Sequence, residues 1–311
     1  MDRGEPADAR QWLGALPDLA AHRELDQAAP RGARETLSLA MHARHLAARL
    51  EWHLLGNHLF ANAKALLFAG AHFDGPEAEG WLATGRAILD AELGEQVLAD
   101  GGHFERAPMY HAIIAEDVLD LVNLARAYPG ALGALEGRLR DLAPLMLDWL
   151  AAMTHPDGRI AFFNDGAFAI AAEGDDLDAY ARRLGLRPGR APADGALWLA
   201  ASGYARLARG DQVALLDMAA VGPDYLPGHA HADTLSFEWS VGRERVVVNG
   251  GVSVYGAGAE RLRQRGTAAH STLTLDDENS SQVWGGFRVA RRARVAEAWA
   301  GEREGGLAAQ G

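Results

Sequence analysis

The sequence predicts an α+β protein of two domains, in which a helical part precedes a part built of antiparallel strands. Residues 35 to about 184 carry apolar side chains at helical spacing, with short Gly/Pro loops between them. Arg187–Gly195 is a proline- and glycine-rich connector, and the segments after it alternate apolar and polar side chains. Helices followed by a run of strands indicate an α+β fold or separate domains. We place the domains at residues 1–190 and 200–311.

Four helices are expected in the first part. The clearest runs from Leu37 to Phe68, where leucines and alanines recur every three or four positions. Further helices are expected over Pro76–Leu98, from Pro108 to the Pro129-Gly130 pair, and over Ala131–Met153. Helices joined by short loops favour a bundle, a solenoid or a toroid.

Strands are expected in the second part. Gly210-Asp211 separates two strand-like segments, Tyr204–Leu207 and Val213–Met218, which predicts a hairpin. Thr234–Val241 is the clearest strand, because Leu235 and Phe237 fall on one face and Ser236 and Glu238 on the other. The pattern continues in Val246–Asn249, Thr272–Leu275 and Phe287–Val295, whereas Gly305–Gly311 is of low complexity and predicts no packed element.

Composition excludes several classes of function. The 311 residues include no cysteine, which excludes a disulfide scaffold, a cysteine-ligated zinc site and thiol catalysis. The net charge of −12 argues against non-specific binding to nucleic acid or to an anionic membrane surface. Apolar runs stay below the ~18 residues of a membrane span. Met1–Arg10 lacks the apolar stretch of a signal peptide.

The charge is unevenly distributed along the chain. The first 200 residues hold 18 basic and 29 acidic groups, whereas the last 111 hold 12 and 13. Seven arginines stand against three acidic residues between Arg261 and Arg294. This cationic stretch is either a surface for an acidic ligand or a solvated strand face, and both interpretations stay open.

The segment from Gly228 to Asp233 is the first candidate for chemistry. His229, His231 and Asp233 alternate along the chain, so an extended backbone would project all three to one side. Such a cluster suits a metal ion or a proton-transfer pair, and the alternative is a hydrogen-bonded surface turn. His270, 39 residues after His231, is a candidate third ligand.

Two further clusters lie in the helical part. Gly56-Asn57-His58 falls inside the predicted long helix, where glycine and asparagine are poor helix formers, and marks either a site or a kink. The segment Gly101–His111 gathers Glu105, Arg106 and Tyr110 with two histidines in a loop and a helix start. A tyrosine in that position is more often a core residue than a catalytic one.

Four segments together resemble the heparinase II/III-type polysaccharide lyases. They are Gly56–Gly70, Asp100–Ile113, Pro223–Gly242 and Arg263–Asp276. The resemblance implies a partial N-terminal (α/α) toroid followed by an antiparallel β-sandwich that is incomplete at the C-terminus. It also implies a lyase that cleaves an acidic polysaccharide containing uronic acid, such as a glycosaminoglycan or alginate, by β-elimination.

The resemblance assigns roles to individual residues. Asn57 matches the asparagine that binds the uronate carboxylate, and His58 matches the histidine beside it. Tyr110 matches the tyrosine that protonates the leaving oxygen, and His229 matches the other acid/base. Arg106, Glu105 and Arg265 are expected to contact the substrate, and His111 is either part of the site or a structural neighbour of Tyr110.

A divalent metal ion, most often zinc, is also implied. His231 and His270 match two of its ligands, and Asn249 stands where the resemblance places an aspartate. An amide is a weaker zinc ligand than a carboxylate. Three outcomes stay open: a loosely bound ion, replacement of the missing ligand by Asp233 or water, or a site without metal. The ion would brace the loop that carries His229.

Other readings also stay open. A metal-dependent hydrolase would use a His-x-His pair near its N-terminus, which does not suit this position. A cupin-like module would employ His229, His231 and His270 but leave Asn57 and Tyr110 without a role. An inactive or truncated carbohydrate-binding relative is the non-enzymatic alternative. The family resemblance indicates the periplasm, the lack of a visible signal peptide allows the cytoplasm, and the oligomeric state is not predicted.

Overall fold

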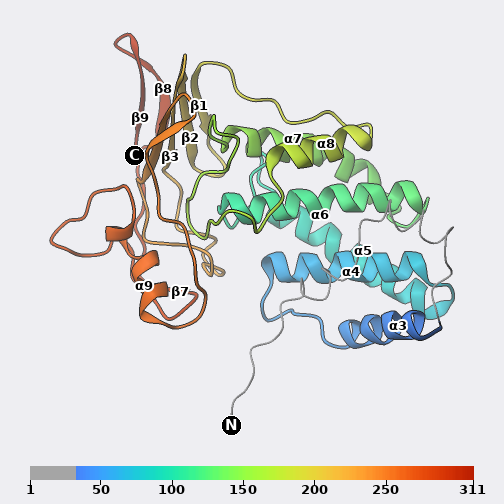
Figure 1. Cartoon of the computed structure of the whole chain (residues 1–311). Coiled ribbons are helices and arrows are strands. Elements are labelled where there is room, and N and C mark those ends of the chain that lie inside the picture. Colours follow the sequence, from blue (N-terminus) through green and yellow to red (C-terminus); the bar gives the residue numbers. More distant parts are fainter. Residues whose placement is uncertain (1–32) are drawn as a thin grey trace. The chain divides into compact units, whose positions relative to one another are not determined.

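The computed structural model describes residues 33–311, which form two compact units (Figure 1). Of the described residues, unit 1 contains those up to Gly94 and Asp117–Arg140, and unit 2 contains Glu95–Glu116 and Asp141–Gly311. The predicted boundary between residues 190 and 200 follows secondary structure and not these units, so it stays a prediction. The interpretation of Met1–Arg10 lies outside the described residues.

Unit 1 begins with helices α3 (Ala33–Ala47), α4 (Gly56–His72) and α5 (Pro76–Gln96). The single helix predicted over Leu37–Phe68 is therefore wrong, because the chain leaves the helix between α3 and α4. The φ angles of Leu55 and Gly56 are 57° and 51°, which a continuous right-handed helix cannot accommodate. The helix formers on either side obscure this break in the sequence.

Helices α4 and α5 approach each other closely at two glycines. A Cβ on Gly70 would lie 2.7 Å from Leu82 Cγ, and one on Gly85 would lie 2.8 Å from Leu67 Cγ. The part of α6 (Pro108–Ala127) that belongs to unit 1 is joined to α4 by a buried ion pair. Lys64 donates hydrogen bonds to Asp117, at 2.8 Å, and to Asp120. Burial alone would lower the pKa of Lys64, but the two carboxylates outweigh it and raise the pKa.

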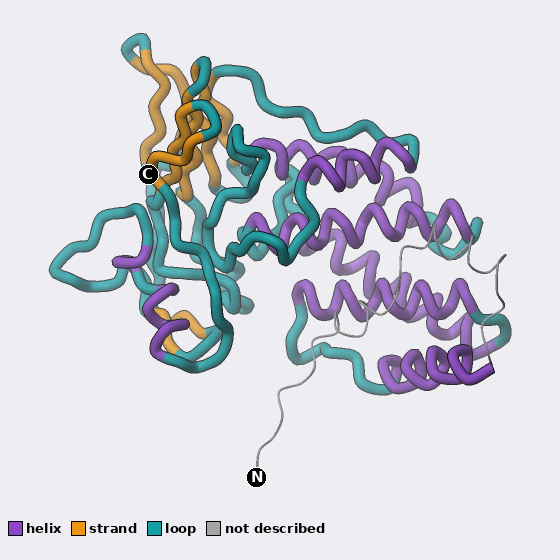
Figure 2. The backbone as a smooth tube through the Cα atoms, in the orientation of Figure 1, coloured by secondary structure: helices purple, strands orange, loops and turns teal. Residues whose placement is uncertain are grey.

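Unit 2 combines helices with an antiparallel sheet, so the predicted order of helices before strands is confirmed. The sheet order is β1-β2-β3-β4-β5, and Figure 2 shows these strands in orange. The predicted hairpin is present as β2 and β3, whose residues Tyr204 and Asp217 are paired. The elements up to β5 are α7 (Leu135–Ala152), α8 (Gly174–Arg183), β1 (Gly195–Leu199), β2 (Tyr204–Arg209), β3 (Gln212–Asp217), β4 (Phe237–Val241) and β5 (Glu244–Val247).

The later strand predictions are largely wrong. Thr272–Leu275 forms no strand, because Ser271 and Thr272 are tied by their hydroxyl groups to the carbonyls of Phe237 and Thr234. The segment Phe287–Val295 contributes only a two-residue strand. The low-complexity terminus, in contrast, pairs as β9. The remaining elements are α9 (Ala259–Arg265), a 3-10 turn (Thr267–Ala269), β6 (Val283–Trp284), β7 (Arg288–Val289), β8 (Trp299–Arg303) and β9 (Gly306–Gln310).

Strand β4 buries its polar face. Glu238 and Ser240 are buried, whereas Phe237 on the other face is 38% exposed. The cause is His155, whose Nε2 lies 2.7 Å from Glu238 Oε2 and whose Nδ1 lies 2.7 Å from Ser240 Oγ. Arg245 adds an ion pair to Glu238 at 3.3 Å. A buried carboxylate is tolerated here because each of its oxygens has a partner.

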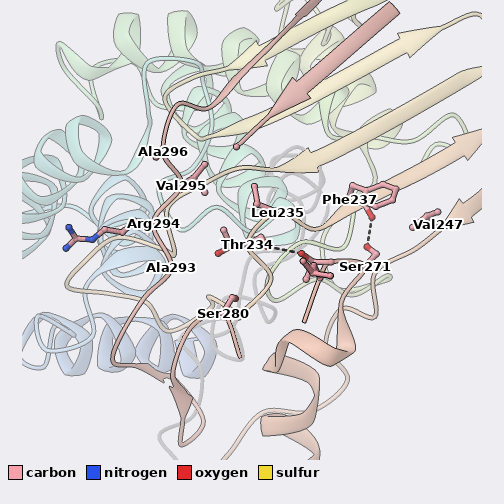
Figure 3. Close-up of a pocket in the computed structure, with 13 residues that line it drawn as sticks. Thr234, Leu235, Phe237, Val247, Ser271, Ser280, Ala293, Arg294, Val295 and Ala296 are labelled. Carbon is pink, nitrogen blue, oxygen red and sulfur yellow. Dashed lines mark hydrogen bonds between the residues drawn. The ribbon is translucent and has the colours of Figure 1, made fainter. Parts of the chain in front are cut away.

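The apolar face of β4 borders a pocket of about 840 Å³ (Figure 3). Its wall includes Leu235, Phe237, Val247 and Val295, together with Gly311. None of the site residues predicted from the sequence lines this pocket. Of the predicted site residues, those in unit 2 lie elsewhere in that unit.

The core of unit 2 holds the sheet against helix α7. Trp149 of α7 packs with Phe163, Tyr204 and Leu215 in a buried cluster. Trp149 also donates a hydrogen bond to Ser202 Oγ at 2.9 Å. This core anchors the loop at Phe163. The next two residues of the loop, Asn164 and Asp165, belong to the candidate site. Among residues 33–311, no helix combines the length and apolarity that a lipid bilayer requires.

Candidate active site

The loop before α6 is built to present Tyr110. Asp100 accepts hydrogen bonds from Gly102 N, at 3.1 Å, and from Ser202 N, at 2.7 Å, which closes the turn. Gly101 has a φ of +88°, and a Cβ there would lie 2.5 Å from the Leu145 carbonyl oxygen, so a side chain has no room. The chain then enters α6 at Pro108, and Tyr110 stands in the first turn.

Tyr110 and His229 form a stacked pair. Their ring centroids are 3.7 Å apart and their planes are inclined by 27°. The Tyr110 hydroxyl lies 3.1 Å from the Tyr255 hydroxyl. Burial, followed by the neighbouring Tyr255, raises the pKa of Tyr110 well above its ordinary value. The phenol is therefore neutral and carries a proton at physiological pH.

Asp165 connects the two histidines of the His-x-His segment. Its carboxylate accepts from His229 Nδ1 at 2.9 Å and from His231 Nε2 at 2.7 Å. Arg261 adds two further hydrogen bonds, one of them at 2.9 Å. Burial alone would raise the pKa of the Asp165 carboxyl, but these donors hold the pKa well below its ordinary value. Asp165 is thus a buried carboxylate that orients both rings.

Sequence reasoning missed Asp165 and its neighbour Asn164. The Asn164 side chain accepts from His231 N at 3.0 Å and donates to the Arg106 carbonyl at 2.8 Å. The φ of Asn164 is 58°, a left-handed conformation that asparagine tolerates better than most residues. The available signal was the polar run Asn-Asp-Gly directly after the apolar pair Phe162-Phe163.

His229 has a defined orientation. A carboxylate accepts only, so Nδ1 carries the proton that is donated to Asp165, and Nε2 is left for chemistry. Glu105 Oε2 lies 3.8 Å from Nε2. Burial lowers the pKa of His229, but Glu105 and Asp165 outweigh it, and the net pKa is raised. The structure thus brings three of the predicted site residues together: Glu105, Tyr110 and His229.

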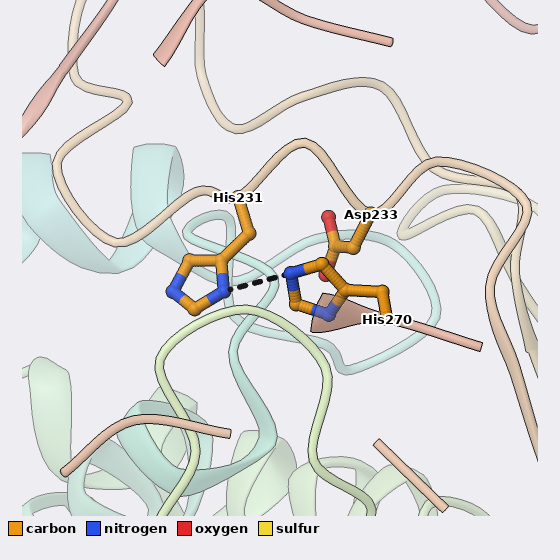
Figure 4. A group of neighbouring side chains, drawn as sticks. All are labelled: His231, Asp233 and His270. Carbon is orange, nitrogen blue, oxygen red and sulfur yellow. Dashed lines mark hydrogen bonds between the residues drawn. The ribbon is translucent and has the colours of Figure 1, made fainter. Parts of the chain in front are cut away.

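Next to the Tyr110–His229 pair lies a group of side chains that could hold a metal ion (Figure 4). His231, Asp233 and His270 are buried and offer ligand atoms within 4.8 Å of one another. His231 Nδ1 and His270 Nε2 face each other at 3.3 Å. His231 gives its Nε2 proton to Asp165, and His270 gives its Nδ1 proton to Asn249 Oδ1 at 3.0 Å. When both rings are neutral, the facing nitrogens present lone pairs, which fits a cation between them.

Asn249 lies beside this group, and its predicted place among the ligands stays a prediction. Its Oδ1 accepts from His270 Nδ1 and from Ser271 N at 3.3 Å, and its Nδ2 donates to Ser236 Oγ at 3.2 Å. Asn249 thus contacts the His270 ring, and Asp233 is the carboxylate of the group. The cupin-like set changes, because His229 bonds to Asp165 and lies outside this group.

The two arginines expected at the substrate bind backbone carbonyls. Arg106 donates to the carbonyls of Ala220, at 3.0 Å, and Gly222, at 2.8 Å. Arg265 is fully buried and donates twice to the Ala230 carbonyl, at 3.1 and 2.9 Å. Both hold the loop that leads to His229, and their predicted contacts with substrate stay predictions. The cationic stretch is therefore partly internal.

Asn57 and His58 lie in unit 1, at the start of α4. Asn57 is buried, and His58 Nδ1 lies 3.6 Å from Glu51 Oε2. Glu51 also accepts from the Asn62 side chain at 2.9 Å. The glycine before Asn57 is thus the first residue of a helix and not an interruption within one, which explains its presence.

His111 was expected to be either part of the site or a structural neighbour of Tyr110, and its contacts are those of a structural residue. Its Nδ1 accepts from His103 N at 3.1 Å, so Nε2 carries the proton that is donated to the Met146 carbonyl at 2.9 Å. Burial lowers the pKa of His111 to about 3. His103 is held in the same way by Gln96, with 2.8 Å between His103 Nε2 and Gln96 Oε1.

Comparison with known proteins identifies relatives over most of the chain. The family described as Heparinase II/III N-terminus matches residues 36–175, and that described as Heparinase II/III-like, C-terminal, matches residues 191–310. A heparin-sulfate lyase of Pedobacter heparinus is 30% identical over 247 residues, which are 72% of this chain and 36% of the relative. A heparin-sulfate lyase of Bacteroides stercoris is 32% identical over 111 residues, 35% of this chain and 16% of the relative.

Solved structures agree with this fold. A heparan sulfate lyase mutant from Pedobacter heparinus has a TM-score of 0.61 at 25% identity, over 79% of this chain and 42% of that structure. A heparinase III structure has a TM-score of 0.69 at 21% identity, over 86% of this chain and 44% of that structure. A toroid followed by a sandwich is consistent with these likenesses. The chain spans about a third of the length of the first of these relatives.

Proposed function

Because this chain belongs to the heparinase II/III-like family, we propose that it is part of a polysaccharide lyase. The proposed substrate is an acidic polysaccharide that contains uronic acid, and the proposed reaction is β-elimination. The observation that carries the proposal is the Tyr110–His229 pair, in which a protonated phenol stacks against an imidazole oriented by Asp165.

The chemistry sets three requirements. The proton at C5 of a uronate is a weak acid, so the charge that develops on its carboxylate must be stabilised. A base must remove that proton, and an acid must protonate the oxygen that leaves C4. The C5–H and C4–O bonds break, a C4=C5 double bond forms, and one proton moves from the acid to the leaving sugar.

Tyr110 and His229 suit the second and third requirements. The Tyr110 phenol is neutral and carries the proton that the acid role requires. His229 directs its Nδ1 proton to Asp165, so Nε2 is the atom that accepts the C5 proton. Glu105, 3.8 Å from Nε2, stabilises the imidazolium that results.

Asn57 and His58 are proposed to meet the first requirement. Their roles rest on the motif that begins α4, and an asparagine amide can donate to a carboxylate as its charge grows. Asn57→Ala is expected to lower kcat by 10²–10³-fold, in line with removal of one stabilising donor. A change in KM alone would contradict this role.

We further propose that His231, Asp233 and His270 hold a divalent metal ion. Two imidazoles and a carboxylate are a donor set that suits zinc. When bound, the ion would brace the loop by fixing His231, and thereby Asp165 and His229, without contact with the substrate. Asn249 is proposed to orient His270 from the outside.

Lyase activity can be tested on a panel of polymers. Heparan sulfate, hyaluronan, alginate and a bacterial exopolysaccharide would be incubated with the full-length protein that contains this chain. The ultraviolet absorbance of the new double bond reports the reaction. Tyr110→Phe is expected to lower kcat by 10²–10⁴-fold while the fold is retained. Absence of absorbance change on every polymer, from a folded protein, would overturn the proposal.

The metal can be tested without activity. Zinc content after dialysis would be measured for the wild type, Asp233→Ala and Asn249→Ala. Asp233→Ala is expected to lose zinc, whereas Asn249→Ala is expected to keep it with 10–100-fold weaker affinity. Equal retention in Asp233→Ala and the wild type would exclude Asp233 as a ligand.

The periplasm is the proposed location, by family resemblance. Fractionation of cells of the source organism, followed by detection with an antibody, tests it. Recovery with cytoplasmic marker proteins would contradict it.

A further inference from the structure

Two large aromatic side chains stand half exposed beside the acid/base pair. Tyr255 is 48% exposed and Phe287 is 46% exposed. Their ring centroids are 5.9 Å apart and their planes are inclined by only 15°. Adjacent exposed rings in parallel orientation present apolar surface on which a ligand with an apolar face can stack.

The two rings contact Arg261, which pairs with the carboxylate that orients His229. The Arg261 guanidinium lies 5.1 Å from the Tyr255 ring centroid and 5.5 Å from that of Phe287. Arg261 is fully buried, pairs with Asp165, and donates from Nε to the Gly286 carbonyl at 3.0 Å. Arg261 therefore links both rings to Asp165, the residue that orients His229.

The backbone beneath the rings is packed too closely for side chains. A Cβ on Gly286 would lie 2.7 Å from the Gly256 carbonyl oxygen, and Gly256 itself has a φ of +106°. Each glycine adjoins one of the aromatic residues in sequence. The contact between the two loops thus sets the spacing of the Tyr255 and Phe287 rings.

We propose that Tyr255 and Phe287 form a stacking platform for a pyranose ring of the polysaccharide next to the scissile bond. The C–H groups on the face of a pyranose are apolar and slightly positive, and the face of an aromatic ring is slightly negative. The Tyr255 hydroxyl lies 3.1 Å from the Tyr110 hydroxyl, so the platform begins at the proposed proton donor. This inference rests on the proposed function and adds a subsite to it.

The platform would act mainly on binding. A contact made equally in the ground state and the transition state changes KM more than kcat. Phe287→Ala is therefore expected to raise KM about tenfold on the polymer that is cleaved, with a smaller change in kcat. Phe287→Trp, which retains an aromatic face, is expected to restore KM to within about threefold of the wild type.

Trp284 supplies a matched control on the same hairpin. It is 51% exposed, and its ring packs against Arg288, with 5.4 Å between centroid and guanidinium. Trp284→Ala removes an equally exposed aromatic ring that is not part of the proposed platform. KM is therefore expected to stay unchanged. A KM that is unchanged in Phe287→Ala, or raised equally in both variants, would overturn the platform.

Equilibrium binding separates this inference from the proposed reaction. Heparan sulfate and alginate tetrasaccharides would be titrated by calorimetry into Tyr110→Phe protein, with and without Phe287→Ala. Affinity that falls about tenfold with Phe287→Ala supports the platform, even if the wild-type protein cleaves no polymer and the lyase proposal fails. Affinity that does not depend on Phe287, in a protein that cleaves the polymer, overturns the platform and leaves the lyase proposal standing.

Discussion

His229 and His231 are two residues apart and bind the two oxygens of one carboxylate, yet their surroundings differ. His229 stacks on Tyr110, and its side chain is 14% exposed. His231 is fully buried and faces His270 at 3.3 Å. Asp165 thus separates an accessible side, with Tyr110, Tyr255 and Phe287, from a closed side with the candidate metal ligands. The same residue type is proposed for an acid/base role on one side and for a ligand role on the other, because neighbours decide which nitrogen keeps a lone pair.

Asp165→Asn should have the largest effect, because it disturbs both sides. The amide cannot accept from two imidazoles and a guanidinium at once, and Arg261 would be left as a buried charge without its partner. We expect a loss of about 3–5 kcal/mol in the free energy of unfolding, a fall in kcat of at least about 10²-fold, and zinc affinity reduced 10–100-fold. Chemical denaturation, kinetics and metal analysis measure these. A variant that lost only one of the three would show that Asp165 serves one side alone.

His229→Gln should affect the accessible side only. Removal of the base is expected to lower kcat by 10²–10⁴-fold, while zinc content and unfolding temperature stay close to the wild type. Steady-state kinetics on the cleaved polymer and metal analysis of the same sample measure this. Loss of zinc from this variant would contradict the division between the two sides.

His231→Gln should affect the closed side more than the accessible one. Loss of one imidazole ligand is expected to weaken zinc binding by at least about 10²-fold and to lower the unfolding temperature measured with zinc present. The fall in kcat is expected to stay below that of His229→Gln, because His231 acts on the reaction only through Asp165. Equal losses of activity in the two variants would contradict the proposal that His231 acts on the reaction only through Asp165.

His111 differs from His229 and His231, because its buried imidazole bonds to backbone groups and not to a carboxylate. Its folded pKa of about 3 lies below the ordinary value of 6.5. Below pH 6.5 the unfolded chain therefore binds a proton that the folded protein does not, and stability falls as pH falls toward 3. At about 1.4 kcal/mol per pH unit, the loss at pH 4.5 is about 2–3 kcal/mol.

His111→Gln should remove that part of the acid sensitivity. Denaturant unfolding of the wild type and the variant at pH 7 and pH 4.5 measures the difference, and the variant is expected to lose less stability between the two. An equal loss in both would show that His111 does not contribute to the acid sensitivity.

The elements that the sequence predicts well depend on short-range patterns. Periodicity identified α5 and α6, and the Gly210-Asp211 turn identified the β2–β3 hairpin. The break before Gly56 was missed because both flanking segments have good helix formers. The faces of β4 were assigned correctly by alternation, but which face is buried was decided by His155, 83 residues from Glu238 in the chain.

The sequence by itself determined the family, the order of helices and strands, and the motifs that contain Tyr110, His229, His231 and His270. Only the tertiary structure decided that Asp165 orients both histidines, since the hydrogen bonds concerned join residues 64 and 66 positions apart. It also placed Asp233 beside His231 and His270, and Asn249 Oδ1 beside His270 Nδ1. The physical reason is the same in each case. A motif fixes which chemical groups are present, whereas hydrogen bonds between distant segments fix which atom of each group keeps its proton and which is left to react or to bind.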